Sequence, residues 1–380
     1  MNKRIYLSLA HMSGREQDFI KEAFDTNWVV PLGPNVNAFE KELANYLKED
    51  RHVVALSAGT AALHLGLIEL GVQTGDEVIC QSFTFAASAN PIAYQSATPV
   101  YVDSEQDTWN MSPLFLEEAI KDRLRKTGKL PKAIIPVHLY GMPAKMDEIM
   151  TIASQYGIPV LEDAAEALGS EYKGQKCGTF GEFAALSFNG NKMITTSGGG
   201  ALVCGTEEQA KRTMFYATQA RENAPHYQHE CIGYNYRMSN ICAGIGRGQM
   251  FVLDEHIARR RAIHRLYTEL LKDMPGIEVQ QNPSEDFNSN FWLTCILIDL
   301  EKAGFSREDV RLHLADENIE TRPLWKPMHL QPVFKQSPFY GDGTSERLFD
   351  KGLCLPSGPT LTDDDICRVV DEISRLKLHI

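Results

Sequence analysis

The residue in this sequence best placed for covalent chemistry is a lysine that follows an apolar run and precedes three glycines. The segment SFNGNK at 187–192 ends in Lys192, and the triglycine follows at 198–200. Residues 184–188 are apolar enough for a buried strand, and α/β proteins bind ligands where such strands end. A lysine held there can lose its proton and form a Schiff base with a carbonyl cofactor. A lysine in a turn is more often a solvated surface charge, so the interpretation depends on the neighbouring segments.

Two further segments place suitable groups at the ends of predicted strands. Residues 159–163 (PVLED) form an apolar run ending in Asp163, which could pair with the protonated ring nitrogen of pyridoxal 5′-phosphate. The segment SAGT at 57–60 lies between an apolar strand and a helix-like run, so its backbone N–H groups could bind an anion. Taken singly, the SAGT segment is better explained by an ordinary serine or threonine helix cap, and Asp163 could instead cap the segment that follows it.

Six segments, in this order along the chain, together resemble the DegT/StrS family of sugar-nucleotide aminotransferases, which depend on pyridoxal phosphate. They are SAGTAALH (57–64), QSFTF (81–85), PVHLYG (136–141), EDAAEALG (162–169), SFNGNK (187–192) and GYNYRM (233–238). The resemblance covers nearly the whole chain. It implies fold type I of the pyridoxal phosphate-dependent transferases, an α/β fold with a mostly parallel central sheet, helices on both faces and a smaller C-terminal α+β domain.

The resemblance also implies a role for each matching residue. Lys192 would be catalytic, because it would hold the cofactor covalently and then move protons after the donor amine displaces it. Asp163 would pair with the pyridine nitrogen, and Phe85 would stack on the ring, although it could also be a core residue. Glu166 stands where the family usually has glutamine, so it would need a proton or a neighbouring donor. The cofactor-binding residues would be Gly59, Thr60, Phe85, Asp163, Glu166, Ser187, Lys192 and Asn235.

Asn235 and Arg237 lie two residues apart in an extended-looking stretch, which places both on one face of a strand. The resemblance implies that Asn235 reaches the phosphate of a neighbouring subunit's cofactor, so we expect a homodimer with shared active sites. Arg237 would bind the donor carboxylate, a geometry that a guanidinium matches with two hydrogen bonds. The substrate-binding residues would be Arg237, Arg322 and His329.

The loop ETRPLWKPMH at 320–329, with Asn189 and Gly190 beside the lysine, looks like the subgroup that makes 4-amino sugars. The expected reaction moves an amino group from L-glutamate to a UDP-linked 4-keto-6-deoxy-N-acetylhexosamine, for cell-surface glycan or polysaccharide biosynthesis. A 3-keto isomer as substrate, a lyase of the same fold and a catalytically silent regulatory protein remain as alternatives. The presence of Lys192, Asp163 and Ser187 together argues against the silent protein.

The elements that would position these residues alternate between strand and helix. Apolar runs at 53–56, 77–80, 99–102, 133–137, 160–163, 184–188 and 201–204 are separated by helical patterns. Such alternation predicts a mostly parallel sheet covered on both faces. Near residue 250 the pattern changes to a long helix at 251–272, followed by short strands and capped helices. We therefore expect a large cofactor-binding domain at 1–250 and a small α+β domain at 251–380.

Composition narrows the function classes. The 380 residues are 43% hydrophobic and 23% charged, with a net charge of −12, which argues against binding nucleic acid through a basic surface. The basic run at 259–261 lies in a helical pattern and is expected on a solvated face or a subunit contact. Eight cysteines without a C-x-x-C pair and eleven histidines without a ligand pattern predict neither disulfides nor a metal site. With no long apolar run, we expect a cytoplasmic protein that does not enter a membrane.

Overall fold

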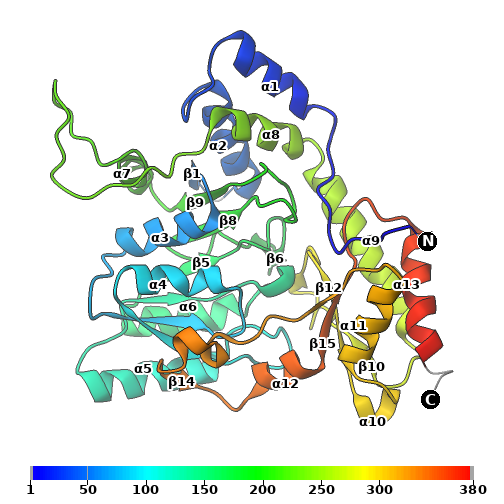
Figure 1. Cartoon of the computed structure of the whole chain (residues 1–380). Helices are drawn as coiled ribbons and strands as arrows, with labels where there is room; N and C mark the ends of the chain where they lie inside the picture. The colour runs from blue at the N-terminus through cyan, green and yellow to red at the C-terminus, as the bar shows by residue number, and fades with distance from the viewer. Residues whose placement is uncertain (1–2, 49, 377–380) are drawn as a thin grey trace.

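The central sheet of the computed structural model, which describes residues 3–48 and 50–376, runs across the larger part of the chain (Figure 1). Its strands lie in the order β1 (His52–Leu56), β9 (Gly200–Cys204), β8 (Phe183–Ser187), β5 (Leu161–Asp163), β4 (Ala133–Ile135), β2 (Glu77–Gln81), β3 (Thr98–Val102) and β14 (Phe339–Tyr340). Strand β9 is antiparallel to both of its neighbours, and the other neighbouring pairs are parallel. The predicted mostly parallel α/β sheet is confirmed.

Helices cover both faces of this sheet. Alternate residues of β1 point to opposite sides, so that Val54 and Leu56 pack with α3 (Gly59–Glu69) while Val53 and Ala55 pack with α2 (Pro34–Leu47). Further along the sheet, α5 (Pro113–Thr127) and α6 (Met146–Tyr156) cover one face, and α4 (Asn90–Tyr94) and α7 (Glu207–Ala217) pack on the other. Burial on both faces explains why these strands are apolar throughout and do not alternate with polar residues.

The smaller part is an antiparallel sheet covered by helices. Its strands lie in the order β10 (Ile277–Val279), β12 (Thr294–Ile298), β15 (Gly352–Leu355) and β13 (Arg322–Pro323). Helices α9 (Leu253–Leu271), α11 (Arg307–Asp316) and α13 (Asp363–Arg375) contribute to its core. No helix among residues 3–48 and 50–376 is both long enough and apolar enough to cross a membrane.

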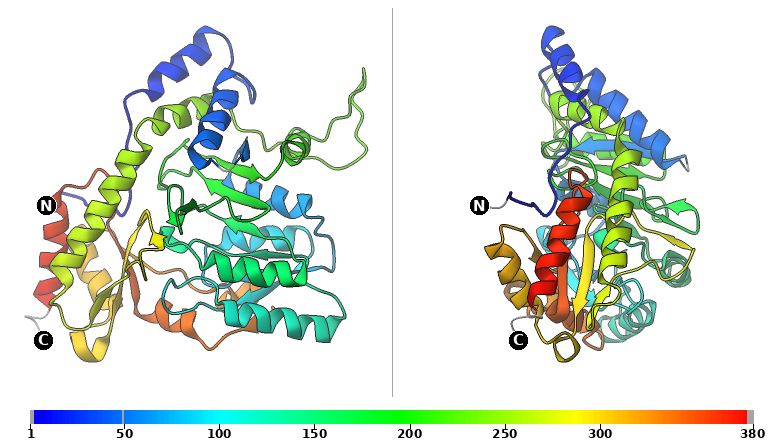
Figure 2. Two further views of the ribbon diagram at one scale, coloured as in Figure 1. Left: turned by 180° about the vertical axis from the view of Figure 1, so that it is seen from behind. Right: turned by 90° about the vertical axis from the view of Figure 1, so that its right-hand side faces the viewer.

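The remaining helices and strands connect or extend these two units. Figure 1 shows α1 (Glu16–Asp25) beside α8 (Asn240–Met250) at one end of the molecule. Both views of Figure 2 show α13 close to the N-terminal segment. The shorter elements are β6 (Glu171–Tyr172), β7 (Gln175–Lys176), β11 (Phe287–Asn288), α10 (Leu300–Ala303) and α12 (Thr344–Lys351).

Two segments pack across the predicted division of the chain at residue 250, one near each end of the sequence. Ile5 pairs with Ile319 and is buried in the core of the smaller unit. In the other direction, β14 forms the edge of the central sheet, and Asp103 accepts N–H bonds from Gly343, at 2.8 Å, and from the residues beside it. Backbone pairing between distant segments decides these placements, and it leaves no local signal in the sequence.

The basic run at 259–261 does not form a fully solvated helix face. Arg260 is buried, with 1% of its surface exposed, and donates to the carbonyls of Trp292 and Ser357. Arg259 donates to the Leu361 carbonyl, and Arg261 donates to the Ser289 carbonyl. The solvated-face alternative fails because these guanidinium groups donate to backbone carbonyl groups 28 to 102 residues further along the chain, while a subunit contact stays a prediction.

Candidate active site

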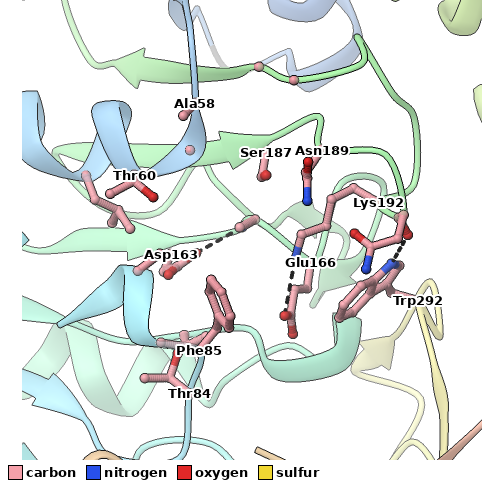
Figure 3. A pocket seen from close by; sticks show the side chains of 18 of the residues that line it. Ala58, Thr60, Thr84, Phe85, Asp163, Glu166, Ser187, Asn189, Lys192 and Trp292 are labelled. Atoms are coloured by element: carbon pink, nitrogen blue, oxygen red, sulfur yellow. Dashed lines mark hydrogen bonds and ion pairs between the residues drawn. The ribbon is translucent and has the colours of Figure 1, made fainter. Parts of the chain in front are cut away.

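A cavity of about 230 Å³ lies where β5 and β8 end and α3 begins (Figure 3). Both strands carry a predicted site residue at their carboxyl end, as expected for a ligand site at the edge of a parallel sheet. The structure brings together most of the residues predicted for cofactor binding. Those that line the cavity are Gly59, Thr60, Phe85, Asp163, Glu166, Ser187 and Lys192.

Lys192 is held by an acid in the wall of the cavity. Its Nζ lies 3.3 Å from Oε1 of Glu166, and Oε2 of Glu166 accepts the Tyr140 N–H at 2.7 Å. Burial raises the pKa of Glu166, while the Lys192 charge and the Tyr140 N–H oppose that rise. Glu166 therefore has two neighbouring donors, and its carboxyl group takes up a proton more readily than an exposed glutamate would.

Asp163 is buried and fixed by two hydrogen bonds. One carboxylate oxygen accepts the Ala165 N–H at 3.1 Å, and the other accepts the hydroxyl of Ser88 at 2.6 Å. Ser88 is in turn 2.7 Å from the hydroxyl of Thr84. The capping alternative for Asp163 thus describes one of its bonds, while the side chain still lines the cavity. Sequence reasoning missed Ser88 and Thr84, although Thr84 belongs to the QSFTF match and Ser88 follows it by three residues.

The start of α3 forms an anion cradle without a side-chain cap. Its N-cap residue is Ala58, which makes no side-chain cap bond, so the ordinary serine or threonine cap is excluded. The first N–H groups of a helix have no carbonyl partner within it, and here they face Ser187 across the cavity. A Cβ on Gly59 would lie 3.0 Å from Cβ of Ser187, and one on Gly200 would lie 2.4 Å from N of Gly59. Glycine at both positions allows the start of α3 to lie this close to β8 and β9.

Aromatic side chains form the opposite wall. Phe85 is 52% exposed and its ring centroid lies 5.2 Å from that of Trp325, so it is not a core residue. Trp325 and Trp292 line the same cavity, and the ring of Tyr140 lies between them, nearly parallel to both. Sequence reasoning missed Trp292, because its segment matches none of the family motifs.

Asn235 and Arg237 lie outside the cavity of their own chain. Asn235 is exposed, and both residues pair through single bridges, Asn235 with Thr218 and Arg237 with Leu56. The guanidinium of Arg237 is 8% exposed, forms a two-point ion pair with Glu40 and donates to the Ala55 carbonyl at 3.0 Å. In this chain the two terminal nitrogens of the Arg237 guanidinium contact Glu40 and Ala55, and the substrate-binding role of Arg237 stays a prediction.

The two other predicted substrate-binding residues, Arg322 and His329, lie in different surroundings. Arg322 is exposed, pairs with Glu320 at 2.7 Å and lines a second cavity that shares Trp292 and Trp325 with the first. His329 does not line this second cavity. Its Nδ1 lies 2.7 Å from the Ser82 hydroxyl, its Nε2 contacts Glu346 and its ring stacks on Phe339. Both ring nitrogens of His329 contact protein groups in this chain, and its substrate-binding role stays a prediction.

Comparison with known proteins places this site in a family. The model of the DegT/DnrJ/EryC1/StrS aminotransferase family matches residues 11–374. The chain is 51% identical to the "Putative pyridoxal phosphate-dependent aminotransferase EpsN" of Bacillus subtilis, over 99% of this chain and 96% of that protein. It is 37% identical to the GDP-perosamine synthase of Escherichia coli O157:H7, over 96% of each. The crystal structure of DesI with its TDP-sugar product superposes with a TM-score of 0.88 at 30% identity, covering 99% of this chain and 93% of DesI.

Proposed function

Because the chain belongs to the DegT/DnrJ/EryC1/StrS aminotransferase family, we propose that it moves an amino group from L-glutamate to a keto-sugar nucleotide. The observation that carries the proposal is the pairing of Lys192 with Glu166 in a cavity that Asp163 and the start of α3 also line. A lysine amine, a buried carboxylate and an anion cradle within one cavity are the groups that pyridoxal phosphate requires.

The chain is an aminotransferase, its cofactor is pyridoxal 5′-phosphate, and the cavity residues fit that cofactor. Lys192 would hold its carbonyl carbon, Asp163 its ring nitrogen and Phe85 one face of its ring. The N–H groups at the start of α3, with Ser187, would hold the phosphate. When bound, the cofactor supplies an electron sink that weakens the bonds at the amine-bearing carbon.

The protein groups then perform the binding and proton steps. Lys192 would take a proton from the substrate carbon that bears the amino nitrogen and return it to the cofactor carbon bonded to that same nitrogen, which requires the lysine amine to be uncharged at that moment. Glu166 lies 3.3 Å from this amine and can hold the proton that the amine loses. Asp163 would hold the ring nitrogen, and its bonds to Ser88 and Ala165 fix the carboxylate plane.

The substrate proposed here is a 4-keto-6-deoxy sugar nucleotide, UDP-linked and N-acetylated. Support comes from the second cavity, where the exposed Arg322 offers charge to a diphosphate and Trp325 offers a flat apolar face. The relatives named as GDP-perosamine synthase and DesI act on, or are bound to, nucleotide-linked sugars, as their names state. Products of this class serve polysaccharide and glycan biosynthesis.

The test is a panel of 3-keto and 4-keto sugar nucleotides, each linked to UDP, GDP or TDP and offered with L-glutamate. We expect kcat/KM to be highest for the UDP-linked 4-keto compound. A preference for a 3-keto compound would overturn the sugar assignment, and a preference for GDP would overturn the nucleotide assignment. Neither result would affect the aminotransferase reaction itself, whereas no glutamate-dependent turnover of any compound would overturn it.

We also propose that two chains form a dimer in which Asn235 serves the partner's site. Asn235 is exposed but does not line the cavity of its own chain. The segment between α7 and α8 projects from the body in Figures 1 and 2 and carries Tyr227, 76% exposed, and Ile232, 82% exposed. Exposed apolar side chains on a projecting segment are typical of an interface.

Co-expression tests the shared site. Chains with Lys192→Ala and chains with Asn235→Ala are each expected to be inactive alone, and their heterodimers should regain part of the activity, because one of the two sites is intact. Purification through two different affinity tags isolates the heterodimer. An inactive heterodimer would contradict the proposal.

A further inference from the structure

Trp292, just before β12 of the smaller unit, contacts both Lys192 and the residue that precedes it (Figure 3). Its indole N–H donates to the Asn191 carbonyl at 2.7 Å, one residue before the lysine. Its ring face lies under the amine, with Nζ of Lys192 4.1 Å from the ring centroid. The same side chain thus holds the turn that carries the lysine and provides an electron-rich surface for the charged amine.

The backbone of Trp292 is fixed to the larger unit by its own turn. Asn290 accepts the Trp292 N–H at 2.8 Å through its side-chain oxygen, and its side-chain nitrogen donates to the Glu166 carbonyl at 3.0 Å. Phe291 between them has a φ of 47°, a left-handed conformation that costs energy in a residue with a side chain. Arg260 holds the carbonyl of Trp292. Such anchoring leaves the ring little freedom to move away from Lys192.

The ring is also connected to the acid that pairs with Lys192. Trp292 stacks on Tyr140, with ring centroids 6.3 Å apart and planes 15° apart. The backbone N–H of Tyr140 donates to Glu166, and Tyr140 also has a left-handed φ, of 55°. One aromatic stack therefore adjoins both the amine and its carboxylate partner.

We propose that Trp292 is a positioning residue for Lys192. It holds the lysine amine in its charged form beside Glu166 until the cofactor or the substrate binds there. The ring face stabilises the cation, and the indole N–H fixes its place at the cavity. The smaller unit thereby sets how readily the reactive lysine becomes a neutral nucleophile. The inference rests on the proposed function only for the identity of Lys192 as the reactive amine.

Two substitutions separate the two contacts. Trp292→Leu removes the ring face and the N–H, whereas Trp292→Phe keeps an aromatic face and removes only the N–H. The full chain, freed of cofactor, is labelled with an amine-acetylating ester across a range of pH. The extent of labelling at Lys192 is read by peptide mass spectrometry, with the exposed Lys211 on α7 as the reference in the same digest. Only a neutral amine reacts with this reagent.

For Trp292→Leu we expect the pH of half-maximal labelling at Lys192 to fall by about 0.4 to 1.5 units, the range that a cation over an aromatic face supports. Trp292→Phe should keep the wild-type midpoint and raise only the plateau of labelling at Lys192. Without the indole N–H, the turn that carries the lysine is held less firmly. A purely structural tryptophan would change the plateau in both variants and the midpoint in neither, and that result would overturn the proposal. The same midpoint shift in both variants would overturn it as well.

A second measurement keeps the proposal testable if Trp292→Leu does not fold. The sequence has four tryptophans, so the indole N–H region of a nitrogen-labelled protein contains few signals. Lys192→Met removes the charge while keeping a side chain of similar length, and it should shift the Trp292 indole signal, which Trp292→Phe identifies by its loss. Lys211→Met is the matched control and should leave that signal in place. An unshifted signal in Lys192→Met would refute the contact, whether or not the aminotransferase reaction is established.

Discussion

Replacing Arg237 by methionine tests whether this residue stabilises the fold or binds the amino donor. Methionine has a similar length but leaves the Glu40 carboxylate without its cation. The paired side chains are only 6% and 15% exposed, and the guanidinium also donates to the Ala55 carbonyl. Removing one partner of a buried ion pair costs about 3–5 kcal/mol. Because Glu40 keeps the Ala55 N–H at 2.7 Å, we expect a loss near the lower end, about 3 kcal/mol.

The assay is urea unfolding at a fixed protein concentration, with KM for L-glutamate measured on the same preparations. Glu40→Gln is the matched control, since it breaks the same pair from the other side. It should lower the free energy of unfolding to a similar degree, and the double variant should lose less than the sum of the two. Neither single variant should raise KM more than the other. The reasoning is refuted if Arg237→Met alone raises KM at least about tenfold while its free energy of unfolding stays within about 0.5 kcal/mol of wild type.

Three further predictions concern the cavity and its support. Asp163→Asn should retain cofactor but lose most of kcat, because a neutral amide no longer keeps the ring nitrogen protonated; unchanged turnover would make Asp163 purely structural. Glu166→Gln should remove an ionisation above pH 4.5 from the pH profile of kcat/KM, because burial raises the pKa of Glu166; superimposable profiles would contradict this. Burial lowers the pKa of His264 to about 4, so the unfolded chain takes up a proton below pH 6.5 while the folded chain does not. The contribution of neutral His264 to the free energy of unfolding is therefore complete above pH 6.5, and about 2 kcal/mol of it is lost at pH 5. His264→Gln should reduce the fall in the free energy of unfolding, measured with urea between pH 7.5 and pH 5, by that amount.

Much of the central sheet could be predicted because its strands are locally distinctive. Strands buried on both faces, such as β8 and β9, appear as short apolar runs between helical patterns. The family resemblance assigned Asp163 and Ser187 to one site, and they line one cavity because the parallel neighbours β5 and β8 end at the same edge of the sheet.

Sequence reasoning did not foresee contacts whose partners lie far away in the sequence. Arg237 pairs with Glu40, 197 residues earlier, and His329 contacts Ser82, 247 residues earlier. Motif resemblance supplies a residue's type and position but not the group that occupies its donors. Trp292 was missed for the same reason, because its contact with Lys192 joins two units that each look complete in the sequence.

The most direct test of the central claim is a single half-reaction with the amino donor. The purified chain, loaded with pyridoxal phosphate, is mixed with L-glutamate alone, and the visible absorption of the cofactor is followed together with 2-oxoglutarate release. We predict loss of the visible band and one equivalent of 2-oxoglutarate per chain for the wild type, and neither for Lys192→Ala. An unchanged spectrum and no 2-oxoglutarate from the wild type, or an unimpaired half-reaction in Lys192→Ala, would contradict the account.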